Sequence, residues 1–232
     1  MRLWEKNIRQ VVPYVPGEQP EGDKIVKLNT NENPYPPAPG VKKVLEELDT
    51  DRLRKYPDPA ATVLVKELAA YYGLGEDQVF VGVGSDDVLA MSFLTFFNTD
   101  KPVLFPDVTY SFYKVWADLF KVPFETPALK EDFTIDIKDY AKENGGVIFP
   151  NPNAPTGVYM PLDQIEEMLI ANQDVVVIVD EAYVDFAGPS ALELLEKYEN
   201  LLVVQTFSKS HSMAGMRIGF AMGHPDLIRA LN

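Results

Sequence analysis

The chain has 232 residues, of which 46% are hydrophobic, so it can bury a sizeable core as one large domain or two small ones. Its 35 acidic and 21 basic residues give a formal net charge of −14, which disfavours nucleic acid and anionic membranes as partners because phosphate contacts need cations. The absence of cysteine excludes disulfides, thiolate nucleophiles and cysteine-bound metals, and no signal-peptide core or membrane-length apolar run is found, so a cytoplasmic location is predicted.

Residues 1–40 are predicted to form an irregular N-terminal arm, because prolines at positions 13, 16, 20, 34, 36, 37 and 39 prevent a long helix. From residue 41 to residue 232, apolar β-branched segments alternate with segments of helical period. The predicted strands are 79–83, 102–106, 146–150, 174–180 and 201–207, and the predicted helices lie near 41–49, 60–72, 86–97, 110–120, 162–171 and 189–197. Several strands are apolar without a break, which indicates an α/β fold, a three-layer α/β/α sandwich around a mostly parallel sheet.

The last ten residues, GHPDLIRALN, have a helix start at Pro225 and Asp226 and then apolar residues at helical spacing. The sequence stops at Asn232 without a glycine or proline stop signal. We therefore expect residues 41–232 to be one domain of a longer protein.

Polar residues follow five of the predicted strands. Because ligands of open α/β sheets bind outside the carboxyl ends of the strands, these residues are expected to converge on one surface. The segments are Gly84 to Asp87, with Ser85 expected to cap the next helix; Tyr110 after the second strand; NPNAPTG (151–157); Asp180 and Tyr183; and Ser208 with Lys209.

Each of these features also has a plain structural interpretation. GVGSDD (82–87) lacks the third glycine of a dinucleotide fingerprint, NPNAPTG has the composition of an ordinary turn, and Tyr110 fits core packing. Lys209 fits a solvated loop lysine, the commoner role of lysine. Asp180 is harder to explain in this way, because a carboxylate that ends a buried strand needs a cation or hydrogen bonds.

Two other chemistries are excluded by the sequence. A serine hydrolase of the α/β type needs G-x-S-x-G, and residues 82–86 read GVGSD. With two histidines, no H-E-x-x-H helix and no cysteine, the chain has too few ligands for a catalytic zinc, so no metal site is predicted.

Six motifs together resemble a known enzyme family. In chain order they are LNTNENPYPP (28–37), KYPDP (55–59), GVGSDD (82–87), NPNAPTG (151–157), DEAYVDF (180–186) and TFSKSHSMAGMRIGF (206–220). They resemble the fold-type I pyridoxal-phosphate aminotransferases and, within them, the histidinol-phosphate aminotransferases. The resemblance implies amino transfer between a small amino donor and a 2-oxo acid, namely from L-histidinol phosphate to 2-oxoglutarate in histidine biosynthesis.

The resemblance also implies a role for each central residue. Lys209 would hold pyridoxal phosphate as a Schiff base and then move the proton between the substrate's Cα and the cofactor's C4′. Asp180 would pair with the pyridine nitrogen and keep it protonated. Tyr183 would donate to the ring's 3′ oxygen, and Tyr110 would stack on the ring face.

A phosphate site is implied as well. Its ligands would be backbone N–H groups at a helix start, two hydroxyls and one guanidinium, with glycines that allow close backbone approach. The residues concerned are Gly84, Ser85, Asp86, Thr206, Ser208 and Arg217, with Gly215 and Gly219 as the glycines of close approach.

The family is homodimeric, and the resemblance implies that Tyr56 reaches the cofactor phosphate in the partner's site. The arm, with Asn31, Asn33 and Tyr35, would close over the substrate. The family also continues into a smaller C-terminal domain whose arginine binds the substrate's carboxylate or phosphate, and the present sequence is expected to lack that domain.

Two positions depart from the family pattern. The lesser departure is Val83 in the glycine loop, where asparagine is frequent. The residue before Pro-Thr-Gly is usually an asparagine that donates to the 3′ oxygen, but here it is Ala154, with Asn153 one place earlier. Either Asn153 substitutes for it through a shifted loop, or Tyr183 acts alone.

Three alternatives remain open at this point. The chain could be another fold-type I enzyme, such as an aromatic aminotransferase or a threonine-phosphate decarboxylase. It could be a non-catalytic α/β module in which Lys209 and Arg217 hold a phosphorylated ligand, or a folded but inactive remnant.

Overall fold

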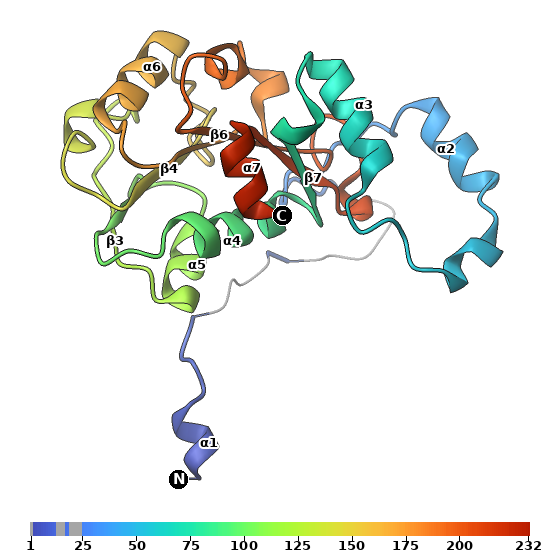
Figure 1. Ribbon diagram of the computed structural model, residues 1–232, viewed down its shortest axis with the longest axis horizontal. Helices are drawn as coiled ribbons and strands as arrows, with labels where there is room; N and C mark the ends of the chain where they lie inside the picture. Colours follow the sequence, from blue (N-terminus) through green and yellow to red (C-terminus); the bar gives the residue numbers. More distant parts are fainter. Residues whose placement is uncertain (1, 13–16, 19–24) are drawn as a thin grey trace.

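The computed structural model describes residues 2–12, 17–18 and 25–232 (Figure 1). Pro13, Pro16 and Pro20 of the predicted arm lie outside the described residues. The described part of the arm contains one short helix, α1 (Leu3–Lys6), and is otherwise irregular up to α2 (Pro39–Glu46).

The described residues form one seven-stranded sheet with the order β1-β7-β6-β5-β4-β2-β3. Its strands are β1 (Val79–Gly82), β2 (Val103–Leu104), β3 (Phe124–Glu125), β4 (Gly146–Pro150), β5 (Val177–Asp180), β6 (Leu201–Thr206) and β7 (Gly219–Gly223). All neighbours from β6 to β3 are parallel, and β7 runs antiparallel to both β6 and β1. The predicted mostly parallel sheet is confirmed, and β3 and β7 are strands that the sequence prediction missed.

Helices cover both faces of this sheet (Figure 1). Alternate residues of each central strand enter two separate cores: on β5, Val177 and Val179 pack on one side and Ile178 on the other. The first core includes residues of α3 and α6, and the second includes residues of α4, α5 and α7. The continuous apolar runs therefore mark strands buried on both faces, and the three-layer architecture is confirmed.

The longer helices agree with the sequence prediction to within about two residues, the usual uncertainty of helix ends. They are α3 (Thr62–Tyr72), α4 (Ser85–Phe96), α5 (Phe112–Phe120), α6 (Leu162–Ala171) and α7 (Pro225–Leu231). The helix predicted over 189–197 is wrong: this segment contains only a 3-10 turn, Ala191–Leu194. Its start is fixed by Ser190, whose side chain accepts from the N–H of Leu192, and by Glu181, which accepts from the N–H of Ala191.

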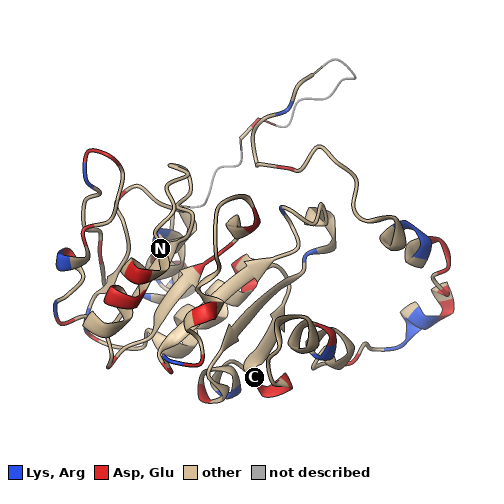
Figure 2. Ribbon diagram, turned by 90° about the horizontal axis from the view of Figure 1, so that it is seen from above, with Lys and Arg blue, Asp and Glu red and all other residues tan. Residues whose placement is uncertain are grey.

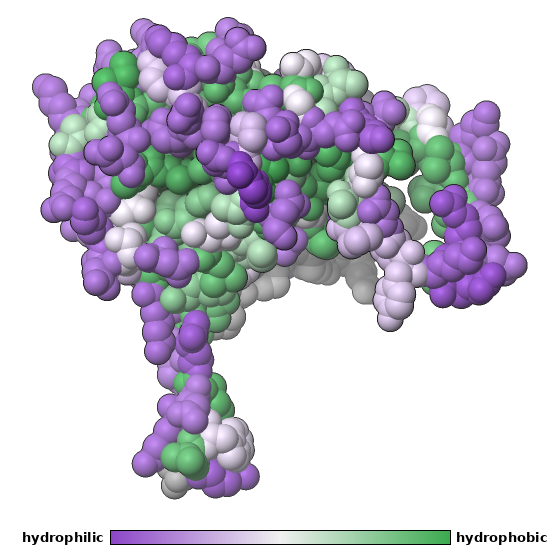
Figure 3. Space-filling view, in the orientation of Figure 1, coloured by the Kyte–Doolittle hydropathy of each residue, from purple (hydrophilic) through white to green (hydrophobic). Residues whose placement is uncertain are grey.

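The segment with α2 and the 3-10 turn Thr50–Arg54 projects to one side of the sheet layers and carries both basic and acidic residues (Figure 2). Large apolar side chains on it are exposed, namely Val44, Leu45, Leu48 and Leu53. Figure 3 shows hydrophobic residues on the side of this segment that faces the sheet layers and hydrophilic residues over most of the rest of it. Among the residues that the structure describes, no helix has the length and apolar character needed to cross a membrane.

Candidate active site

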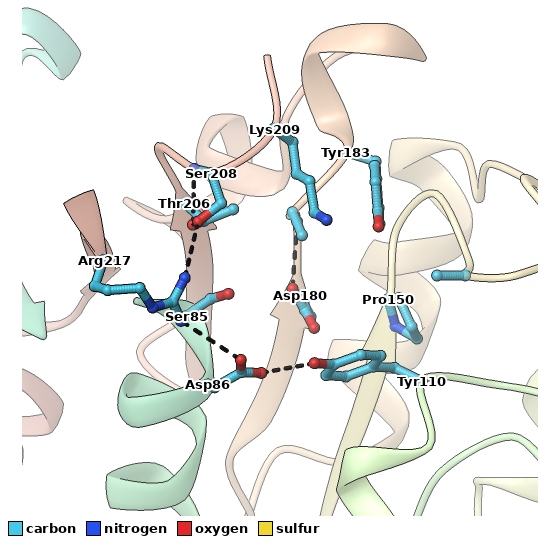
Figure 4. Close-up of a pocket in the computed structure, with 12 residues that line it drawn as sticks. Ser85, Asp86, Tyr110, Pro150, Asp180, Tyr183, Thr206, Ser208, Lys209 and Arg217 are labelled. Carbon is cyan, nitrogen blue, oxygen red and sulfur yellow. Dashed lines mark hydrogen bonds and ion pairs between the residues drawn. The ribbon is translucent and has the colours of Figure 1, made fainter. Parts of the chain in front are cut away.

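A pocket lies at the carboxyl ends of the parallel strands (Figure 4). Pro150, Asp180 and Thr206, the last residues of β4, β5 and β6, all line it. Its space between atoms is about 560 Å³, counting the open mouth. The complete lining is Ser85, Asp86, Tyr110, Pro150, Ala154, Asp180, Ala182, Tyr183, Thr206, Ser208, Lys209 and Arg217. The structure thus brings together residues from all five predicted strand ends.

One end of the pocket has the chemistry of an anion site. Helix α4 begins there at Ser85, and its N-cap is Gly84, with φ +90°; no side chain caps this helix end. The prediction that Ser85 caps the helix is therefore wrong, because Ser85 is already the first helical residue. An uncapped helix start leaves backbone N–H groups and the positive end of the helix dipole available to an anion.

Hydroxyl and guanidinium groups surround this helix start. The Ser208 N–H donates to Thr206 Oγ1 at 3.1 Å, and the Thr206 hydroxyl donates to Ser208 Oγ at 3.0 Å. Arg217 Nη1 lies 3.5 Å from Ser208 Oγ, and Arg217 itself adopts the left-handed conformation, with φ +52°. Together these groups can bind a phosphate through several charge-assisted hydrogen bonds.

Close backbone packing holds the two sides of the anion site together. A Cβ at Gly219 would lie 2.2 Å from the Ser85 nitrogen and 2.3 Å from the Gly84 carbonyl carbon. Gly219 is therefore required for the start of β7 to approach the start of α4, as the sequence predicted. At Gly215 nothing lies within 4 Å of an added Cβ, so no contact with described protein atoms requires a glycine there.

Asp86 links the anion site to the aromatic side of the pocket (Figure 4). Its Oδ1 accepts a hydrogen bond from the Tyr110 hydroxyl at 2.7 Å, and its Oδ2 lies 3.7 Å from Arg217 Nη2. Burial and then the Asp86 carboxylate raise the pKa of the Tyr110 phenol, so this hydroxyl stays protonated and acts as a donor. Tyr110 therefore lines the cavity while its ring packs against the second core.

The middle of the pocket holds a buried carboxylate and an amine. Asp180 is only 4% exposed, and Lys209 points into the same cavity (Figure 4). Burial raises the pKa of Asp180 to about 6, while hydrogen bonds from the Tyr113 hydroxyl and the Ala182 N–H oppose that rise. A cationic ring nitrogen placed against Asp180 would offset this cost of burial.

The N-terminal arm contacts two residues of the pocket lining, Lys209 and Tyr183. Lys209 Nζ lies 5.4 Å from the centre of the Tyr183 ring and donates to the Thr30 carbonyl at 2.9 Å. The Asn31 side chain donates to the Tyr183 hydroxyl at 2.9 Å. The Asn33 side chain donates to the carbonyls of Lys209 and Ser210 at 3.2 and 3.1 Å. The arm therefore contacts the two side chains to which the sequence assigned chemistry.

Three predicted site residues do not line the pocket, namely Gly84, Asn153 and Tyr56. Gly84 is the N-cap of α4. Asn153 donates to the Val108 carbonyl and to Thr156 Oγ1, both at 3.0 Å, and the pocket wall at this point is formed by Ala154. The Asn153 side chain thus donates to neighbouring loop residues in this structure, whereas Tyr183 lines the pocket. Tyr56 is fully exposed and is not part of the pocket of its own chain.

Sequence reasoning missed Tyr113, which donates to Asp180 Oδ2 at 2.8 Å from a fully buried position. A signal for it existed, because Tyr110 and Tyr113 are three residues apart at the start of a predicted helix and so share one face.

Comparison with known proteins gives the family. The sequence profile described as "Aminotransferase class I and II" matches residues 23–232. The chain belongs to the class I and II aminotransferase family. Every residue that lines the pocket falls within the matched range.

Curated members of the aminotransferase family are close relatives. A histidinol-phosphate aminotransferase of Pseudomonas putida is 56% identical over 230 residues, which cover 99% of this chain and 66% of the relative. One of Clostridium botulinum is 54% identical over 231 residues, covering 100% and 65%. The chain thus spans about two thirds of the length of these curated aminotransferases.

Solved aminotransferase structures share the fold. A histidinol-phosphate aminotransferase from Sinorhizobium meliloti, solved in complex with pyridoxal 5′-phosphate, has a TM-score of 0.79 and 26% identity to this chain. The match covers 87% of this chain and 57% of that structure.

Proposed function

We propose that this chain is the cofactor-binding part of a pyridoxal-phosphate-dependent histidinol-phosphate aminotransferase. The observation that carries the proposal is a single pocket that holds an amine, a buried carboxylate and an anion site, at Lys209, Asp180 and the start of α4. The 56% identity to the Pseudomonas putida aminotransferase supports the same reaction, and the Sinorhizobium meliloti structure supports the same cofactor. The reaction would convert L-histidinol phosphate and 2-oxoglutarate into imidazole acetol phosphate and L-glutamate.

The residues of the pocket fit this cofactor. The uncapped helix start, the Thr206 and Ser208 hydroxyls and Arg217 would bind its phosphate. Tyr110, which lines the same pocket, would contact the flat ring of the cofactor. Asp180 would accept a hydrogen bond from the ring nitrogen, and Tyr183 would face the ring oxygen.

Pyridoxal phosphate, when bound, supplies an aldehyde that captures amines and a ring that accepts the electrons left at the substrate's Cα. The Lys209 amine would hold the aldehyde carbon at rest. As a free amine, Lys209 would take up a proton from the substrate's Cα and release it at C4′. Asp180 would keep the ring nitrogen positively charged, because the attraction between opposite charges is stronger in a buried site than in bulk water.

A second copy of the chain is part of the proposal. Tyr56 is fully exposed, and it follows a segment whose apolar side chains are exposed as well. Such a surface fits a protein interface. In a twofold dimer Tyr56 would reach the phosphate site of the partner subunit, as the resemblance to the fold-type I aminotransferases implies.

Reduction of the cofactor onto the protein tests this function. The purified chain is incubated with pyridoxal phosphate, treated with borohydride and digested, and the labelled peptide is identified by mass spectrometry. We expect one modified residue, Lys209, and none in Lys209→Ala. Lys121→Ala, at an exposed lysine far from the pocket lining, is the matched control and should label as the unmodified chain does. A chain that stays colourless and unlabelled would refute the proposal.

The amino donor is tested separately. Half-reactions with L-histidinol phosphate, L-phenylalanine and L-threonine phosphate are followed by the spectrum of the bound cofactor. Faster turnover with phenylalanine or threonine phosphate than with histidinol phosphate would favour an aromatic aminotransferase or a threonine-phosphate decarboxylase. A non-catalytic module would bind phosphorylated compounds with only a modest loss in Lys209→Ala.

A further inference from the structure

Two hydrogen bonds from described residues of the protein reach the carboxylate of Asp180. Its Oδ2 accepts from the Tyr113 hydroxyl at 2.8 Å, and its Oδ1 accepts from the Ala182 N–H at 3.2 Å. Apart from burial, these two donors lower the pKa of Asp180 and the like-charged Asp86 raises it. The Tyr113 hydroxyl is therefore the main protein group that favours the ionised form of Asp180.

Tyr113 is placed to act as a donor to Asp180 and to nothing else in the site. It is 0% exposed, and burial together with Asp180 raises the pKa of its phenol, so the hydroxyl keeps its proton. Because the hydroxyl hydrogen lies on Asp180, the phenol supports the charged carboxylate. Tyr113 lies in the first turn of α5, which fixes its ring in the core.

The same ring also packs against a second residue of the site. The centroids of the Tyr113 and Tyr110 rings are 5.7 Å apart with an interplanar angle of 83°, an edge-to-face contact. On its other side the Tyr113 ring makes a similar contact with Phe105, at 5.9 Å and 67°. One buried side chain thus supports both the carboxylate at the ring nitrogen and the aromatic wall.

We propose that Tyr113 is a positioning residue for amino transfer, which holds Asp180 ionised and aimed at the ring nitrogen of the cofactor. This inference rests on the proposed function. Without the hydroxyl, Asp180 keeps one peptide N–H donor, and its carboxyl holds a proton up to a higher pH than in the wild type. A protonated Asp180 no longer attracts a positive ring nitrogen, so the ring becomes a poorer electron acceptor.

A purely structural role for Tyr113 makes a different prediction. Phenylalanine would fill the same volume and keep both ring contacts, so the loss of the hydroxyl alone would leave the cofactor unchanged. Tyr140 provides the matched control: it is 1% exposed, and its hydroxyl has no hydrogen-bond partner among the described residues. Tyr140→Phe removes a buried hydroxyl without touching the site.

The test follows the ring nitrogen directly. The wild-type chain, Tyr113→Phe and Tyr140→Phe are each loaded with pyridoxal phosphate labelled with ¹⁵N in the ring, and the ¹⁵N shift is recorded against pH. The other titratable or charged groups in or beside the pocket of Asp180 are all present in each variant, namely Asp86, Glu181, Tyr110, Tyr183, Lys209 and Arg217. A difference between the titrations therefore reports the change at position 113.

We expect the ring nitrogen of Tyr113→Phe to lose its proton at least about one pH unit lower than in the wild type, a tenfold lower proton affinity. Turnover should fall roughly tenfold or more with little change in KM, as for a hydrogen bond to a charged group. Tyr140→Phe should match the wild type in both measurements.

Other results would contradict the positioning role, alone or together with the proposed function. A Tyr113→Phe titration that coincides with the wild type would overturn the positioning role while leaving the proposed function intact. A wild-type chain that binds no cofactor would overturn both. If Tyr113→Phe does not fold, 3-fluorotyrosine placed at position 113 keeps the ring and strengthens the donor, and it should move the titration to higher pH; no movement would count against the role.

Discussion

The Lys209 amine donates a hydrogen bond to the Thr30 carbonyl at 2.9 Å, although 179 positions separate the two residues. The contact places the N-terminal arm directly over the residue to which the cofactor chemistry is assigned. Thr30 and Asn31 both adopt the left-handed conformation, with φ of +61° and +52°, so the backbone turns sharply at this point. The Asn33 side chain then joins the turn to the Lys209 segment by hydrogen bonds to the carbonyls of Lys209 and Ser210.

The first prediction concerns the hydrogen bonds by which Asn33 holds the arm to the Lys209 segment. Asn33→Ala removes two hydrogen bonds between the arm and the Lys209 segment, each worth about 1 kcal/mol. We expect the arm to be cut faster by protease and pyridoxal phosphate to dissociate roughly tenfold faster. Limited proteolysis and cofactor release, followed by absorbance, measure the two effects. Asn7→Ala, in the arm but not in the pocket lining, is the control, and equal rates for both variants would contradict this role of Asn33.

The second prediction compares two glycines four residues apart. Gly219→Ala places a methyl group 2.2 Å from the Ser85 nitrogen, so β7 must move away from the start of α4. We expect a loss of about 1–3 kcal/mol in the free energy of unfolding and weaker binding of pyridoxal phosphate. Gly215→Ala meets nothing within 4 Å and should stay within about 0.5 kcal/mol of the wild type. Urea unfolding and cofactor titration check both variants, and a Gly215→Ala defect as large as that of Gly219→Ala would disprove the packing argument.

Local chemistry made most of the fold predictable from the sequence. The apolar runs at 146–150 and 201–207 predicted buried strands because parallel strands covered on both faces have no polar side. The strand β7 was missed because its core residues, Phe220 to Met222, are flanked by glycines and pair antiparallel to β6, a contact that no local pattern encodes.

The positions of the main pocket residues were predictable from the sequence, but some of their contacts were not. Strand ends located Asp180 and Lys209, since residues that follow parallel strands must meet at one edge of the sheet. The bond from Tyr113 to Asp180 could not be read from the sequence, because it joins a helix to a strand 67 positions away and depends on how α5 packs. The direction of the Asn153 side chain was equally hidden, because the turn around it sets which donors it meets.

The third prediction concerns Glu181, a second buried carboxylate directly after Asp180. It is 1% exposed and accepts from the Ser190 hydroxyl at 2.6 Å, the Ala191 N–H at 2.7 Å and the Gln205 side chain at 2.8 Å. Burial nevertheless raises its pKa from the ordinary value of 4.5 to about 7. Between these two values the folded protein holds a proton that the unfolded chain releases. The free energy of unfolding therefore falls as the pH rises through this window, and the contribution is flat above it.

Glu181→Gln removes this proton and with it that part of the pH dependence. We expect the decrease in the free energy of unfolding between pH 5 and pH 8 to be smaller by about 2 kcal/mol in the variant than in the wild type. The quantity to compare is the change with pH, since the amide also disturbs the hydrogen bonds at every pH. Glu167→Gln, at an exposed position on the same chain, should keep the wild-type pH dependence. Parallel curves for the wild type and Glu181→Gln would show that Glu181 does not titrate in this window.

The last prediction tests whether Tyr56 acts across a dimer. Tyr56→Ala and Lys209→Ala should each abolish or strongly reduce amino transfer when present in both subunits. In a mixed dimer, the subunit that retains Lys209 receives an intact Tyr56 from its partner, so one of its two sites is complete. Random exchange of subunits yields half mixed dimers, and the mixture should recover about a quarter of the wild-type activity. Mixing Asp180→Asn with Lys209→Ala is the control, because both residues line the pocket of their own chain and no site becomes complete. Sedimentation shows whether subunits have exchanged, and exchange without recovered activity would place the role of Tyr56 within its own subunit or remove it from the site altogether.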